Sequence, residues 1–70
     1  MLKEYRMRKN MTQEELEAKT NIDRKTIFRI ENDLNIPLVD TFGKIVIALE
    51  MTDKEIAEEI KKATLKRKNK

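Results

Sequence analysis

Three basic side chains occupy one arc of a short predicted helix near the middle of the chain. At the helical period, Arg24, Lys25 and Arg29 fall on the side opposite Ile27 and Ile30, so burial of the isoleucines directs the basic groups outward. An arginine guanidinium can form two hydrogen bonds to the edge of a guanine, and all three residues can contact phosphate. Taken alone, the arc is equally typical of an ordinary solvated helix face.

Several groups that commonly support catalysis or metal binding are missing from the sequence. Cysteine and histidine are absent, which removes thiolate nucleophiles, imidazole bases and the usual zinc and haem ligands. No glycine-rich phosphate loop is present. We therefore expect no enzymatic activity, no cofactor and no metal. The helix carboxylates are interpreted as capping groups or as parts of polar helix faces; they are Glu14, Glu15, Glu55, Glu58 and Glu59.

Composition favours one small all-α domain. The 70 residues include one glycine and one proline, and 41% of them are charged, which is typical of polar helix faces and not of a sheet rich in hairpins. The net charge of +3 hides an asymmetry, because the last ten residues hold six basic groups and no acid, and residues 1–60 carry −3. We predict a domain over 1–60 and a basic tail over 61–70. No apolar run in the sequence is long enough to span a membrane or to form the core of a signal peptide. We therefore expect the chain to be cytoplasmic.

Local signals place the helices of the first half. Thr12 and Glu15 form a capping-box pattern that starts a helix over 13–20, and Asn21 tolerates the left-handed conformation of a turn. Asp23 can cap the next helix, over 24–32. Upstream, a short helix is predicted over 2–9.

The second half is predicted to contain two further helices after a loop over 32–37. Phe42, Ile45, Val46 and Leu49 recur at helical spacing. Thr52 and Glu55 then repeat the capping box. The fifth helix carries a stripe of Ile56, Ile60 and Ala63 and is expected to fray into the basic tail.

These features together resemble the Cro/cI repressor-type (Xre) helix-turn-helix family over about residues 2–56. The resemblance rests on MTQEEL at 11–16, Ile22, TIFRIEN at 26–32 and Pro37. It implies a compact, five-helix, lambda-repressor-like fold in which the third helix enters the major groove of double-stranded DNA. The chain would then be a transcriptional regulator, interpreted as a repressor.

The resemblance also implies roles for individual residues. Base contacts are assigned to Arg24, Lys25, Phe28 and Arg29, and phosphate contacts to Gln13, Thr26 and Asn32. Gln13 also lies in the first turn of its helix, where free amides and the helix dipole attract anions. Arg6 and Glu31 match a salt bridge between the first and third helices.

Three positions depart from the family pattern. Glu17 stands where a small alanine usually packs, so we expect Glu17→Ala to stabilise the fold. Asn21 and Asp33 replace glycines and are expected to be left-handed. Phe28 replaces a small or polar residue, and either a thymine methyl contact or peripheral core packing would explain it.

The expected partners are a DNA operator and a second copy of the chain. The candidate dimer interface contains Ile47, Ile56 and Ile60. The alternative is a protein-interaction module of the same fold that binds another regulator through these residues. The tail over 61–70 either adds phosphate contacts or is simply solvated.

Overall fold

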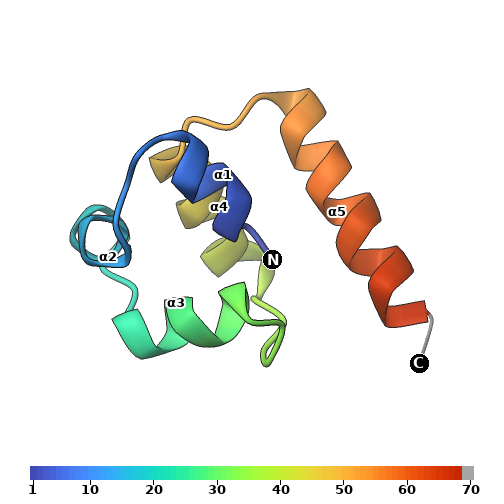
Figure 1. The fold of residues 1–70 in the computed structure, drawn as a ribbon, viewed down its shortest axis with the longest axis horizontal. Coiled ribbons are helices and arrows are strands. Elements are labelled where there is room, and N and C mark those ends of the chain that lie inside the picture. The colour runs from blue at the N-terminus through green and yellow to red at the C-terminus, as the bar shows by residue number, and fades with distance from the viewer. Residues whose placement is uncertain (69–70) are drawn as a thin grey trace.

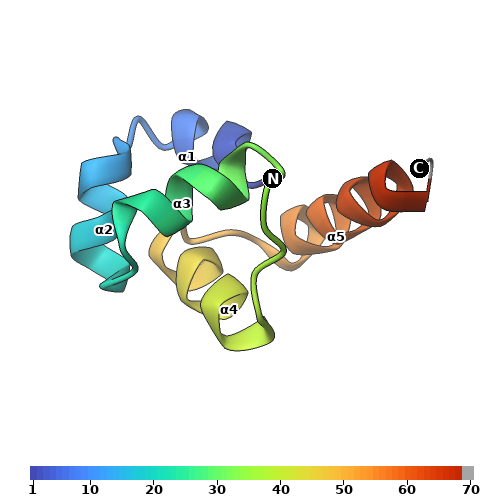
Figure 2. The same ribbon diagram turned by 90° about the horizontal axis from the view of Figure 1, so that it is seen from below.

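The computed structural model describes residues 1–68, which form five helices without a strand (Figure 1). α1 to α4 pack together, and α5 lies along one side of this group (Figures 1 and 2). The predicted all-α, five-helix fold is confirmed. Within residues 1–68, no helix combines the length and apolar character needed to cross a membrane. The helices are α1 (Lys3–Arg8), α2 (Gln13–Thr20), α3 (Arg24–Glu31), α4 (Val39–Ala48) and α5 (Asp53–Lys68).

Local contacts determine both ends of α2. Thr12 Oγ1 accepts a hydrogen bond from the Glu15 N–H at 3.0 Å, and Glu15 Oε1 accepts one from the Thr12 N–H at 2.8 Å. This capping box satisfies two backbone donors at the start of the helix. At the other end, Asn21 has a left-handed φ of 60°. The predicted helix over 13–20 is therefore confirmed at both ends.

α3 begins after a short turn and is anchored to the core by its isoleucines. Asp23 Oδ2 accepts a hydrogen bond from the Lys25 N–H at 3.1 Å, which is the predicted cap. Ile27 and Ile30 are each 1% exposed. The helix ends one residue before the predicted range, and Asp33 then turns the chain with a φ of 60°, as expected.

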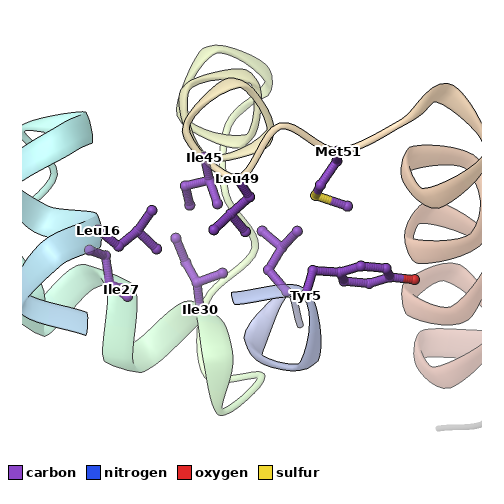
Figure 3. Packing of buried hydrophobic residues seen from close by; sticks show 8 residues of the cluster. Tyr5, Leu16, Ile27, Ile30, Ile45, Leu49 and Met51 are labelled. Carbon is purple, nitrogen blue, oxygen red and sulfur yellow. The ribbon is translucent and has the colours of Figure 1, made fainter. Parts of the chain in front are cut away.

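The hydrophobic core lies among α1 to α4. Most of its side chains point toward one another from different helices, whereas the Tyr5 ring points toward α5 (Figure 3). Burial of an apolar side chain contributes about 1.5–3 kcal/mol to folding. The largest fully buried side chains are Tyr5, Leu16, Ile27, Ile30, Ile45 and Leu49.

α5 continues to Lys68, whereas the sequence analysis expected it to fray into a tail. Ion pairs with the body of the domain support this part of the helix. Lys62 bonds to Glu4, and Lys66 Nζ lies 2.8 Å from Asp33 Oδ2. Residues 69–70 of the predicted basic tail lie outside the described residues.

The side of α5 that faces the domain is partly polar. Ile56 packs against the core, and Glu59 is only 4% exposed, whereas Ile60 is 48% exposed. The interpretation of Glu59 as part of a solvated helix face is wrong, because a residue three positions after Ile56 lies on the same side of the helix. Glu59 borders an open hollow of about 500 Å³ between α5 and the start of the chain.

Candidate nucleic-acid interface

α3 presents a basic face with one aromatic ring on the side away from the core. Arg24, Lys25, Phe28 and Arg29 are all exposed, and Phe28 is 51% exposed. At about 100° per residue, Phe28 lies between Arg24 and Lys25 around the helix axis, and Arg29 follows Lys25. The structure thus brings the four predicted base-contacting side chains to one surface.

A buried polar network holds α3 against α1 and α2. Arg6 Nε lies 2.7 Å from Glu31 Oε2, and Arg6 Nη2 donates to Glu31 Oε1 at 3.0 Å. Arg6 Nη1 also donates to the Met11 carbonyl at 2.6 Å. Gln13 Nε2 completes the network with a 3.0 Å hydrogen bond to Glu31 Oε1. Three helices therefore share one charged cluster, and this restricts the orientation of α3.

The contact with Glu31 limits what Gln13 can offer to a phosphate. One N–H of its side-chain amide donates to Glu31, and Oε1 is an acceptor that cannot bond to a phosphate oxygen, so the second amide N–H is the side-chain donor left for a phosphate. A phosphate contact can therefore use this second N–H, with the bond to Glu31 kept, or a backbone N–H in the first turn of α2.

The other two residues assigned to phosphate lie at opposite ends of α3. Thr26 is half-buried in the first turn, and Asn32 is exposed just after the last. Asn32 Nδ2 donates to the Phe28 carbonyl at 2.8 Å, which satisfies one of the carbonyls left free at the helix end.

Acidic residues of α2 surround the first residue of α3. Glu17 Oε2 accepts a hydrogen bond from the Arg24 N–H at 3.1 Å, and Glu17 Oε1 lies 3.9 Å from Arg24 Nε. Glu14 Oε2 lies 3.8 Å from Arg24 Nη1. The expected gain from Glu17→Ala assumed a charge without a partner, whereas the tight turn brings the Glu17 carboxylate to a free N–H at the positive end of α3.

The cations of this face differ in their surroundings. Arg24 is paired with two carboxylates. Among the side chains that the structure describes, no acid pairs with Lys25 or Arg29. Their charges are therefore the more available to a nucleic acid.

The three candidate dimer residues are not gathered on one patch. Ile47 is 77% exposed and borders a hollow with Lys19 and Thr20 at the end of α2. Ile56 and Ile60 belong to α5, which lies at the opposite end of the molecule from α2 (Figures 1 and 2). Ile56 also packs against the core of its own chain, so Ile60 is the member of this pair that remains half exposed.

An exposed apolar segment, which the sequence did not predict, leads from the end of α3 into the first residue of α4. Leu34, Ile36, Leu38 and Val39 are all exposed, although each is strongly hydrophobic. The run of apolar residues around Pro37 was visible in the sequence, but it has no helical or strand period from which a buried face could be inferred.

Two short helices joined by a tight turn, with the second buried on one face and basic on the other, define a helix-turn-helix protein. A helix-turn-helix family model matches residues 2–56, which is well over half of the chain. The chain belongs to this family, the Cro/cI-type, Xre-like family of DNA-binding transcription regulators. Comparisons with curated proteins and with solved structures gave no match.

Proposed function

We propose that this chain binds double-stranded DNA sequence-specifically, with α3 in the major groove, and that it acts as a repressor. The observation that carries the proposal is the exposed face of α3, where Lys25, Phe28 and Arg29 stand opposite the buried Ile27 and Ile30. An α-helix fits the major groove, and an arginine there can bond to both acceptors of a guanine. Repression requires only that the bound protein occupy the operator.

The surrounding residues have separate roles in this proposal. Arg24 and Phe28 contact bases together with Lys25 and Arg29, and Phe28 meets a thymine methyl. Gln13, Thr26 and Asn32 contact phosphates on either side of the groove. Because residues 1–60 carry −3, attraction to DNA depends on this local cluster and not on the overall charge of the body.

Selection of bound sites from random duplexes tests the proposal. We expect the wild type to select a defined motif, and Arg29→Ala to lose preference at one position per half-site while its circular dichroism is unchanged. A lost two-bond base contact costs about 1–3 kcal/mol. Lys54→Ala is the matched control, because it removes one exposed positive charge from α5. Equal ratios of specific to random binding in the wild type and Arg29→Ala would exclude α3 as the base-contacting helix.

We propose that binding involves a homodimer on a two-fold operator. Such dimers place their recognition helices in successive major grooves, about 34–36 Å apart. We place the contact between the two copies at Ile60 on α5, which is 48% exposed and is not part of the core of its own chain.

A protein-interaction module is the second candidate function. The exposed Ile47 and the apolar segment before α4 favour it, because neither is used in the proposed DNA contact. Titration with duplex DNA over a range of salt concentrations separates the two functions. Binding that weakens linearly on logarithmic axes as salt increases supports the DNA-binding function. Failure to bind any duplex at low salt favours the protein-interaction module.

A further inference from the structure

The carboxylate of Glu17 connects α2 to both the backbone and the side chain of the first residue in α3. One oxygen accepts the Arg24 N–H at 3.1 Å, and the other lies 3.9 Å from Arg24 Nε. Glu17 is half-buried, whereas the Glu14 side chain, which also faces the Arg24 guanidinium, is 74% exposed. Glu17 is therefore the more constrained of the two acids.

We propose that Glu17 is a positioning residue for base recognition, which acts through Arg24 without contacting DNA itself. This inference rests on the proposed insertion of α3 into the major groove. By capping the helix and holding the Nε edge of the guanidinium, Glu17 directs Arg24 along the groove-facing side of α3. The base preference opposite Arg24 then depends on a residue of the preceding helix.

The charge of Glu17 also restricts what Arg24 can contact. An arginine released from its carboxylates can turn to the nearest phosphate, which adds affinity for every sequence alike. Held between Glu14 and Glu17, Arg24 adds little to such nonspecific binding. Glu17, which also fixes the backbone N–H of Arg24, thus favours a guanidinium that is committed to one base.

Glu17→Gln separates the two contacts. The glutamine keeps an oxygen that can accept the Arg24 N–H, so α3 remains capped, but it lacks the charge that attracts the guanidinium. In site selection from random duplexes, we expect this variant to lose preference at the one position where Arg24→Ala also loses it. We further expect its salt dependence to steepen by about 0.9 log units, which corresponds to one added phosphate contact.

Glu14→Gln is the matched control, because it removes the same charge near the same guanidinium without touching the backbone of α3. We expect it to retain the wild-type base preference. If Glu14→Gln and Glu17→Gln change selection equally, the effect is one of charge alone and the positioning role is excluded. A wild-type motif and salt slope in Glu17→Gln would also overturn the proposal.

The double variant Arg24→Ala/Glu17→Gln tests whether Glu17 acts through Arg24. We expect it to select the same sites as Arg24→Ala, and a further change in preference would contradict the mechanism. If Glu17→Gln melts below the assay temperature, its selection and salt titration are carried out below its melting temperature, with the wild type under the same conditions, and the same relaxed preference is expected. Arg29→Ala distinguishes the two proposals. If Arg29→Ala keeps its sequence preference, major-groove recognition by α3 is refuted. If Arg29→Ala loses preference but Glu17→Gln selects the same sites as the wild type, only the role of Glu17 is refuted.

Discussion

The guanidinium of Arg6 lies against the carboxylate of Glu31 in a two-bond ion pair, with Nε 2.7 Å from Oε2 and Nη2 3.0 Å from Oε1. Both residues are buried, and the pair joins the first helix to the third. Because Glu31 also accepts a hydrogen bond from Gln13, the pair links all three helices that orient the proposed recognition face.

We expect Arg6→Ala to destabilise the domain by about 3–5 kcal/mol, because it leaves the Glu31 carboxylate buried without its main partner. In a domain of this size such a loss is most of the total stability. Urea denaturation followed by circular dichroism measures it. Arg6→Met/Glu31→Leu should be less destabilised than Arg6→Ala, since no charge is then left unpaired. A single variant as stable as the wild type would show that the ion pair contributes little.

Glu17→Ala is expected to lower the free energy of unfolding by roughly 0.5–1 kcal/mol, which reverses the expectation drawn from the sequence. Loss of a capping acceptor costs about 1 kcal/mol, and the higher helix propensity of alanine recovers less than half of that. Thermal melting checks the sign. Glu14→Ala is the control, because Glu14 forms an ion pair with the Arg24 side chain and, among the described residues, no hydrogen bond to the backbone of α3; its melting temperature should equal or exceed that of the wild type.

The ends of α2 and the Glu17 contact show which parts of the structure the sequence could predict and which it could not. The ends of α2 depend on Thr12, Glu15 and Asn21, which act on backbone groups within a few residues, so the boundaries follow from local pattern alone. The Glu17 contact with Arg24 depends on how two helices pack across the turn. A side chain that looks misplaced in sequence thus becomes a cap in space.

The orientation of α5 was harder to predict for the same reason. Hydrophobicity suggested that Ile56, Ile60 and Ala63 form one stripe, but the buried position between Ile56 and Ala63 is occupied by Glu59. An acid on the inward face is not expected from amphipathic spacing. The position of Glu59 is explained by the open hollow that α5 borders and by the ion pairs that α5 forms with the domain on that side.

The docking of α5 is expected to depend on pH. The hydrogen bond from Lys62 lowers the pKa of Glu4 below 4.5, and Lys66 together with the N-terminal ammonium lowers the pKa of Asp33 below 3.8. An acid whose pKa is lower in the folded state than in the unfolded state stabilises the fold at pH values above its unfolded-state pKa. This stabilisation is lost as pH falls through the lowered pKa of the folded state. Contacts with Glu4 and Asp33 raise the pKa of Lys62 and Lys66 above 10.5, so the lysine contribution is lost only as pH rises through the raised values. The contribution of these pairs to docking should therefore weaken as pH falls below about 4.5 and as pH rises above about 10.5.

Tyr5 provides the probe for this prediction. It is the only tyrosine in a chain without tryptophan, and Lys62 Nζ lies 5.1 Å from its ring centroid. Its near-ultraviolet circular dichroism should change below about pH 4.5, before the far-ultraviolet signal of the whole fold. Lys62→Met should reduce this acid-induced change, whereas Lys61→Met, at the neighbouring exposed position, should preserve it. An identical acid profile in Lys62→Met would refute the role assigned to the Glu4 pair.

Phe28→Ala is expected to weaken operator binding without destabilising the domain, because half of the ring is already exposed. Replacement of thymine by deoxyuridine at the contacted position removes the methyl group that the ring would meet. Wild-type affinity should then fall by about 0.8 kcal/mol, the value of one buried carbon group, and the affinity of Phe28→Ala should not change. A clear loss of thermal stability in Phe28→Ala, with no effect of deoxyuridine on the wild type, would instead assign Phe28 to peripheral core packing.

Ile60→Asp is expected to abolish dimer formation and leave the monomer folded. Ile60 is the half-exposed isoleucine of α5. In a two-fold dimer each copy would bring one introduced carboxylate into the apolar contact, and both charges would lose their water. Sedimentation at high micromolar concentration should show a dimer for the wild type and a monomer for the variant, with unchanged far-ultraviolet circular dichroism. Ile47→Asp is the matched control, because it places the same charge on a more exposed isoleucine beside α2, at the other end of the molecule. If Ile47→Asp dissociates the dimer and Ile60→Asp does not, the interface lies on α4. A monomeric wild type, both free and on a symmetric operator, would exclude the homodimer altogether.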